Sequence, residues 1–187
     1  MSLKLKSAAV LGTAFILSGL TVPSASAMVI TAEGAALGFT VTNVVTGMPS
    51  NGLGPIGVTV DPQGKILVVD VADGRNYLFN DVDGQTHSDN IGFVGGMGCC
   101  GAYATSNGFA WGGQGSRLVR FNADGSIGAT FGNISVFNGM WTNPVNGHLL
   151  IAAGSILDVD VTDPNNPVAR TIPNTFQGDG LTVSPDG

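Results

Sequence analysis

Two side chains with oxygen atoms that can bind a metal, those of Asn138 and Asp179, occupy equivalent places in a phrase that recurs along this sequence. Each stands directly before the glycine that opens one copy of the phrase, Gly139 in one case and Gly180 in the other. Equivalent positions of a repeat lie in equivalent places of a fold, so we expect the two side chains to converge. Amide and carboxylate oxygens are the ligands that Ca²⁺ prefers. Asn138 and Asp179 are therefore candidate Ca²⁺ ligands, and Asp179 is also a candidate general base.

A simpler interpretation of these two sites stays open. Asn-Gly and Asp-Gly are favourable turn pairs, so both residues can be present for their backbone geometry alone. The corresponding residue in the first copy of the phrase is Ile56, which offers no ligand. A metal site would thus need a further carboxylate from elsewhere in the protein.

The adjacent Cys99 and Cys100 stand at the corresponding place in the second copy, just before Gly101. In an oxidising compartment they can form a vicinal disulfide, a flat and rigid apolar platform at the mouth of a channel. Two free thiols, or a bond to another chain, are equally open alternatives. A single cysteine pair without a second pair does not make a zinc site.

The phrase occurs four times, at residues 57–64, 101–108, 139–147 and 180–187. The copies are spaced by about 40 residues of short strands and turns, a pattern typical of a radial β-repeat with one four-stranded blade per unit. We therefore predict an all-β fold, a β-propeller of which about three and a half four-stranded blades are visible, as a fragment of a six- or seven-bladed ring. The residue before each opening glycine then starts an innermost strand at one mouth of the central channel.

Apolar runs between Asp-, Gly- and Pro-rich turns predict the remaining strands. They are expected at 57–60, 65–69 and 76–79 in the first unit, at 109–111, 117–121 and 127–131 in the second, and at 149–151 and 156–161 in the third. The turn at 81–84 is expected to lead straight into a fourth strand. The segment 28–50, which includes the apolar stretch at 38–45, is expected to supply an outer strand that closes the ring.

Over residues 52–187 the sequence resembles the NHL and SMP-30/gluconolactonase group of propellers, whose blades carry a Gly-apolar-x-apolar-Asp-Pro-x-Gly phrase. The copies at 57–64 and 180–187 match this phrase best, and the segments 179–187 and 138–141 are similar to the lactonase branch. The resemblance implies an architecture more than an activity, because lactonases, lyases and scaffolds share it.

In SMP-30-like enzymes an Asn and an Asp at the positions of Asn138 and Asp179 bind the metal, and the Asp also serves catalysis. Those enzymes use a Glu on another blade as a further ligand. Here Glu33 comes too early in the chain and lacks the surrounding motif. The resemblance thus implies a Ca²⁺ site for which the sequence shows two of the ligands.

The first 27 residues have the features of a signal peptide. Lys4 and Lys6 form a positive start, residues 8–20 are apolar, and Ala25-Ser26-Ala27 fits a cleavage site. We therefore expect an exported protein, located in the periplasm, at the cell surface or outside a bacterium, although an uncleaved N-terminal anchor is the alternative. The predicted organisation is a signal peptide at 1–27, an N-terminal segment at 28–50 and the blades at 51–187, incomplete at the C-terminus.

Composition excludes several classes of partner and structure. With 7 basic and 13 acidic residues the net charge is −6, so the chain lacks the basic surface that nucleic acid requires. After residue 27 no segment has the roughly 18 continuous apolar residues of a membrane span, so no transmembrane helix is expected. All acidic residues but Glu33 are Asp, and with 29 Gly and 9 Pro the chain is unsuited to long helices.

Other motifs predict little chemistry. Residues 96–101 match G-x-G-x-x-G, but a strand rather than a helix follows, so no phosphate site is expected. His87 and His148 have no nucleophile motif beside them, which argues against a Ser-His-Asp hydrolase. Trp111 and Trp141 are expected to pack between blades, with a stacking platform for a ligand as the alternative.

Three classes of function are compatible with these features. The first is an exported propeller that binds a small molecule, glycan or protein at its channel face. The second is a Ca²⁺-dependent lactonase or related hydrolase, with Asp179 as base and Asn138 as ligand. The third is a surface or matrix scaffold.

Overall fold

The computed structural model describes residues 30–49, 54–95, 102–176, 178 and 180–186, and the chain divides into two compact units, Met1–Val41 and Thr42–Gly187. In the first unit, helix α1 (Ala32–Ala36) begins after Thr31, whose hydroxyl accepts the N–H of Gly34 at 3.1 Å. The shortness of α1 agrees with the composition. Among the described residues no helix is long and apolar enough to cross a membrane.

The described residues of the second unit form three four-stranded antiparallel sheets, which we call blades 1, 2 and 3. Blade 1 consists of β2 (Pro55–Val60), β3 (Ile66–Asp70), β4 (Arg75–Phe79) and β6 (Gly92–Gly95); blade 2 of β7 (Tyr103–Ser106), β8 (Phe109–Gln114), β9 (Arg117–Phe121) and β10 (Ile127–Phe131); blade 3 of β11 (Met140–Thr142), β12 (Leu149–Ala152), β13 (Ile156–Asp160) and β14 (Val168–Thr171).

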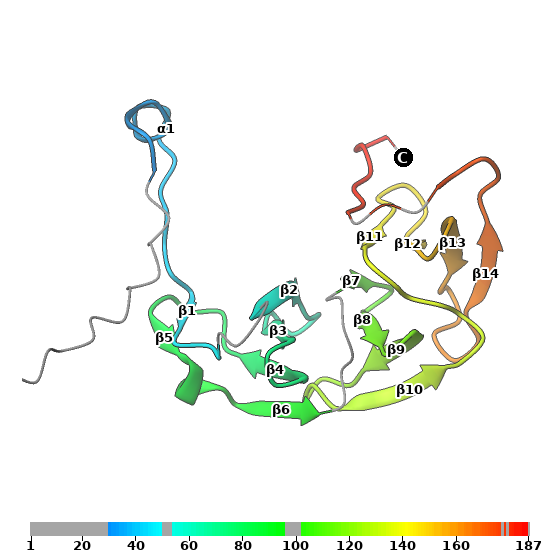
Figure 1. Cartoon of the computed structure of the whole chain (residues 1–187), viewed down its shortest axis with the longest axis horizontal. Helices are drawn as coiled ribbons and strands as arrows, with labels where there is room; N and C mark the ends of the chain where they lie inside the picture. Colours follow the sequence, from blue (N-terminus) through cyan, green and yellow to red (C-terminus); the bar gives the residue numbers. More distant parts are fainter. Residues whose placement is uncertain (1–29, 50–53, 96–101, 177, 179, 187) are drawn as a thin grey trace, which may run out of the picture. The chain divides into compact units, whose positions relative to one another are not determined.

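The first strands of the three blades, β2, β7 and β11, are neighbours in space. Figure 1 shows them on the concave side of the arc that this unit forms, with the last strands β6, β10 and β14 on the convex side. This arrangement confirms that the first three copies of the phrase are innermost strands placed side by side. The all-β, bladed architecture predicted from the repeat is thus the observed one.

The turn after each inner strand is encoded in the phrase. In blade 1, Oδ1 of Asp61 accepts the backbone N–H of Gln63 at 2.9 Å and that of Lys65 at 2.8 Å. Gly64 has a φ of 76°, a left-handed conformation that glycine adopts at little cost. In blade 3 the Asn143 side chain accepts the N–H of Val145 in the same way. These local bonds reverse the chain within a few residues and involve no contact between blades.

Two apolar cores hold the blades together. One lies between blades 1 and 2 and contains the buried side chains Leu67, Val69, Leu78, Tyr103, Ala110, Val119 and Phe121. The other lies between blades 2 and 3 and contains Ala102, Ala104, Trp111, Leu118, Ile134, Val136, Met140, Leu149, Ile151, Val159 and Val161. Trp111 is fully buried and donates its indole N–H to the Ser106 carbonyl at 3.0 Å, which confirms its predicted role in packing between blades.

Gly112 makes room for an aromatic ring in the first of these cores. A Cβ at this position would lie 2.5 Å from the Tyr103 ring and 2.9 Å from the Phe121 ring, closer than real contacts allow. With no side chain there, the Tyr103 ring packs over the strand. Its hydroxyl then reaches blade 1 and donates to Oδ1 of Asn76 at 3.0 Å.

The fourth strand of blade 1 does not follow the turn at 81–84 directly, which corrects the prediction. The turn leads into β5 (Gln85–Thr86), which pairs in parallel with β1 (Val45–Thr46), and then into the 3₁₀ helix η1 (His87–Asp89). The Asp89 carboxylate accepts the Thr86 N–H at 2.7 Å and so stabilises η1. The chain reaches the sheet edge only afterwards, at β6.

Two predicted strands at the ends of the repeat also differ. Of residues 38–45 only Val45 is in a strand, β1, since the pairing with β5 covers two residues. In the fourth phrase, residues 180–186 form no strand, because no described residue supplies a second strand to pair with them. Leu181 still lies beside Gly139, where an added Cβ would be 3.1 Å from the Leu181 nitrogen.

Candidate functional site

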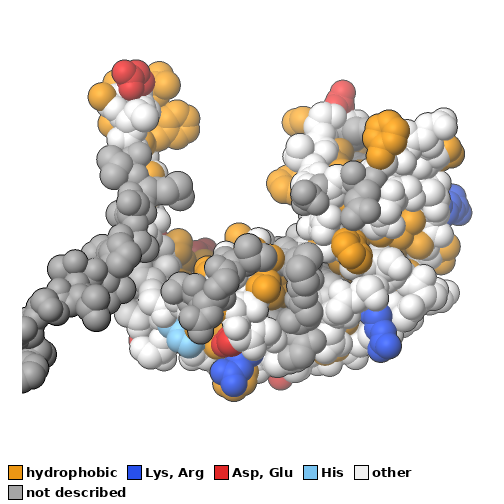
Figure 2. Space-filling view, in the orientation of Figure 1, with side chains coloured by type: hydrophobic (Ala, Val, Ile, Leu, Met, Phe, Trp, Pro, Cys, Tyr) orange, Lys and Arg blue, Asp and Glu red, His pale blue; other side chains and the backbone are white. Residues whose placement is uncertain are grey.

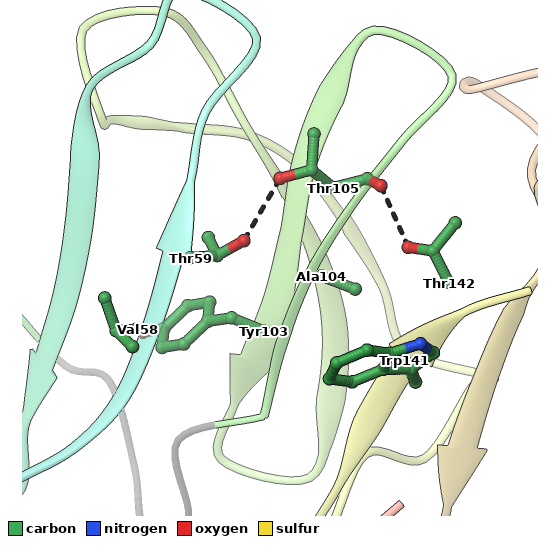
Figure 3. A pocket seen from close by; sticks show the side chains of 7 residues that line it. All are labelled: Val58, Thr59, Tyr103, Ala104, Thr105, Trp141 and Thr142. Atoms are coloured by element: carbon green, nitrogen blue, oxygen red, sulfur yellow. Dashed lines mark hydrogen bonds between the residues drawn. The ribbon is translucent and has the colours of Figure 1, made fainter. Parts of the chain in front are cut away.

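The inner strands of all three blades line a pocket of about 350 Å³ on the concave side of the arc (Figure 3). Its lining residues are Val58 and Thr59 from β2, Tyr103, Ala104 and Thr105 from β7, and Trp141 and Thr142 from β11. The pocket exists because the three strands lie next to one another while their side chains differ in size. It brings aromatic rings and hydroxyl groups from all three blades together.

Three threonines form a chain of hydrogen bonds across the blades. The hydroxyls of Thr59 and Thr105 are 3.1 Å apart, and the Thr105 hydroxyl also donates to the Val60 carbonyl. The Thr142 hydroxyl donates to the Thr105 carbonyl at 2.9 Å. Dashed lines in Figure 3 mark the bonds between the threonines. Each blade is thereby tied to the next beside the pocket.

Trp141 does not pack between blades, which corrects the prediction. Its neighbours on β11, Met140 and Thr142, both face blade 2: Met140 is in the core between the blades, and Thr142 bonds to Thr105. Successive side chains of a strand alternate in direction, so Trp141 is left out of that core, and its indole lies on the side of the pocket in Figure 3. It is 46% exposed and borders the pocket.

Tyr103 contributes its ring to the pocket and not its hydroxyl. The hydroxyl donates to Asn76, and burial raises the pKa of Tyr103 far above its ordinary value near 10. Tyr103 therefore stays neutral over the physiological pH range. None of the lining residues is charged. Figure 2 shows the Lys and Arg side chains of this view towards the outer margin of the blades.

Of the two residues predicted to bind Ca²⁺, the structure describes Asn138 and not Asp179. Asn138 is partly buried two residues before β11, and its N–H donates to the Ala152 carbonyl at 3.3 Å. Asp179 lies outside the described residues, so its convergence with Asn138 stays a prediction. Ile56 is a half-exposed residue of β2. Within the described part of the chain, no three His, Cys, Asp or Glu side chains form a group that can hold a metal ion.

Cys99 and Cys100 also lie outside the described residues, and their disulfide stays a prediction. Sequence reasoning singled out the residue before each opening glycine but missed Thr59, Thr105 and Thr142, which stand two to four residues after that glycine. The signal that was available is a threonine in every inner strand.

The two histidines lie away from the pocket. His148 in blade 3 is 2.7 Å from the Asp158 carboxylate through Nδ1 and 3.6 Å from Asp160 through Nε2. His87 packs edge-on against the ring of Tyr77, with 4.6 Å between the ring centres. The contacts described for the two imidazoles are to carboxylates and to an aromatic ring.

Comparisons with known proteins place the fold. A hydrazine synthase from Kuenenia stuttgartiensis superposes with a TM-score of 0.54 at 16% identity, over 78% of this chain and 42% of that one. The fold is a β-propeller. A virginiamycin B lyase from Staphylococcus aureus is similar with a TM-score of 0.47 at 15% identity, over 68% of this chain and 44% of that chain. At such identities the likeness concerns the fold alone.

This chain spans less than half the length of these propeller structures. No protein-family model matches the sequence. No curated protein matches it significantly. The function must therefore be argued from the pocket itself.

Proposed function

We propose that this protein is a binding propeller, which holds a small organic molecule or the end of a glycan in the pocket between β2, β7 and β11. The observation that carries the proposal is Trp141, which is 46% exposed at the edge of this pocket. Covering an exposed indole with a ligand removes apolar surface from water and favours binding. The volume of about 350 Å³ is within the range of sites for small molecules.

Binding is better supported than catalysis by the side chains that line the pocket. Among the described residues, the lining includes no carboxylate, imidazole, amine or thiol, the groups that most often transfer protons or attack a substrate. The one titratable group, the Tyr103 hydroxyl, is committed to Asn76. The lining offers an aromatic surface and hydroxyl oxygens, which suit recognition.

Trp141 is also the reporter that tests the proposal. Trp111 is buried and hydrogen-bonded, so a ligand in the pocket changes the emission of Trp141 and leaves that of Trp111 unchanged. A library of small molecules and oligosaccharides is screened by emission and by melting temperature. We expect at least one compound to shift both in the wild-type protein and to lose its effect in Trp141→Ala.

The matched control is Phe176→Ala, which removes an aromatic side chain that is 85% exposed and does not line the pocket. This variant should respond to the ligand as the wild type does. The proposal is wrong if no compound in a broad library affects Trp141, or if the stabilisation by a ligand is the same in Trp141→Ala.

A Ca²⁺-dependent hydrolase is the second candidate. The close approach of Leu181 to Gly139 supports it, because the residues before the two phrases, Asp179 and Asn138, are then expected near each other. A bound Ca²⁺ would polarise a carbonyl group and activate water there. This candidate depends on Asp179 and is tested separately below.

A further inference from the structure

The hydroxyl protons of the pocket are all committed inside the protein. Thr105 donates its proton to the Val60 carbonyl, which can only accept, so Thr59 must be the donor in its contact with Thr105. Thr142 donates to the Thr105 carbonyl. A hydroxyl has one proton and two lone pairs. The three threonines therefore have only acceptor lone pairs left for a ligand.

The other lining side chains add few donors. Tyr103 uses its hydroxyl on Asn76, while Val58 and Ala104 are apolar. The indole N–H of Trp141 lies at the end of its ring system farther from Tyr103 in Figure 3. In the part of the chain that the structure describes, no Lys, Arg or His lines the pocket. A ligand whose polar atoms are acceptors would lose its hydrogen bonds to water here and gain few hydrogen bonds from the protein.

Among aromatic side chains, the indole ring of a tryptophan such as Trp141 attracts a cation most strongly. Two other ring faces of the described residues already hold a cation. Arg75 lies over Phe93 at 4.7 Å, and Arg120 lies over Phe109 at 4.6 Å. Within the same part of the chain, no Lys or Arg lies over Trp141. Its ring face is thus available to a cation from outside the protein.

We propose that the ligand of this pocket is an organic ammonium ion, a protonated primary or secondary amine on an apolar body. This inference rests on the proposed binding function and specifies its ligand. The N–H groups of the ammonium match the lone pairs of Thr59 and Thr142, and its charge matches the ring of Trp141. The acidic chain, with a net charge of −6, also favours a cation over an anion.

Four probes that share one phenyl body separate charge from hydrogen bonding. They are phenethylammonium, its N,N,N-trimethyl analogue, 2-phenylethanol and phenylacetate, with methyl β-glucoside as an unrelated neutral polyol. Dissociation constants are measured by Trp141 emission and by calorimetry on the full chain. We expect phenethylammonium to bind about tenfold or more tightly than the trimethyl analogue, because only the former donates hydrogen bonds. Phenylacetate should bind most weakly.

Two variants assign the effect to the pocket. Thr142→Val removes an acceptor and should weaken phenethylammonium several-fold while leaving the trimethyl analogue nearly unchanged. Trp141→Leu should weaken both cations, and more strongly than it weakens 2-phenylethanol. Binding to Trp141→Leu, which lacks the fluorescent reporter, is measured by calorimetry alone. Phe176→Leu is the matched control, and thermal melts verify folding; Trp141→Phe replaces Trp141→Leu if the latter unfolds.

Each outcome decides between the two proposals. If 2-phenylethanol or the glucoside binds as tightly as phenethylammonium, and Trp141 is required, the ammonium inference is wrong while the binding function stands. If no probe binds at millimolar concentration, the ammonium inference is also wrong. If, in addition, the broad library leaves Trp141 unaffected, the binding function is wrong as well.

Discussion

The hydroxyl of Tyr103 in β7 donates a hydrogen bond of 3.0 Å to Oδ1 of Asn76 in β4, and this bond joins blade 2 to blade 1. Both side chains are buried, and among the described residues the side-chain Nδ2 of Asn76 has no hydrogen-bond partner. In the described part of the chain, Tyr103 is therefore the side-chain partner that compensates for burying this amide. Tyr103 also lines the pocket, so the bond supports the pocket wall from behind.

Replacing Tyr103 with Phe should destabilise the protein. The change leaves the buried Asn76 side chain without a partner, at a cost of about 1–3 kcal/mol in the free energy of unfolding. Chemical denaturation measures this loss. In a double-mutant cycle with Asn76→Ala, the combined loss should be smaller than the sum of the two single losses, and strictly additive losses would contradict the proposed link.

Stability should also fall at alkaline pH because of Tyr103. Burial raises the pKa of Tyr103 in the folded protein, while in the unfolded chain the hydroxyl ionises near pH 10. Above about pH 10 the unfolded state therefore binds fewer protons than the folded state, and unfolding becomes easier as the pH rises. Below pH 10 this contribution is complete and constant.

The free energy of unfolding measured between pH 8 and 11 tests this dependence. Tyr103→Phe should reduce its slope above pH 10. The part that remains is expected from Tyr77, the other tyrosine, whose pKa is also raised, first by burial and then by its hydrogen bond to Asp73. An unchanged slope in Tyr103→Phe would show that Tyr103 is not buried as described.

Gly112→Ala should destabilise the contact between blades 1 and 2. The added methyl group would overlap the Tyr103 ring, at 2.5 Å, and displace it from the core. Overpacking of this kind costs about 1–3 kcal/mol. The control is Gly95→Ala in β6, where no atom lies within 4 Å of the added carbon and φ is not positive. Thermal melts should show a clear loss for the first variant and almost none for the second.

Asp179 and Asp186 give a matched test of the Ca²⁺ hypothesis. Both precede a glycine, but only Asp179 stands before an opening glycine of the phrase, whereas Asp186 lies in an exposed turn and accepts from the Ser184 hydroxyl. If Asp179 and Asn138 bind Ca²⁺, added calcium should raise the melting temperature of the wild type and of Asp186→Ala but not of Asp179→Ala. No calcium effect in the wild type would remove the support for a hydrolase.

Cys99 and Cys100 are expected to form a disulfide with each other in oxidised protein. Such a bond lowers the mass of the peptide that contains both residues by about two hydrogens, which mass spectrometry of unreduced digests detects. Alkylation before and after reduction is the control. Two thiols that react without reduction would rule out the bond.

The elements that were predicted correctly are those defined by local chemistry. Strands β9 and β10 have the predicted bounds, 117–121 and 127–131, and the turn after β2 forms through the side chain of Asp61 and the left-handed Gly64. Turn residues and apolar runs act within a few positions of the chain. Their repetition about every 40 residues was enough to predict blades and their inner strands.

The pocket depended on the tertiary structure. Whether Trp141 or its neighbour Met140 enters the core between blades 2 and 3 depends on which face of β11 meets the next sheet, and a single strand carries no information about that choice. The hydroxyl chain from Thr59 to Thr142 likewise crosses residues that are far apart in sequence. The pairing of β1 with β5 also joins distant segments. Periodicity along the chain predicts which strands form, but the contacts between blades select which side chains remain free to bind a ligand.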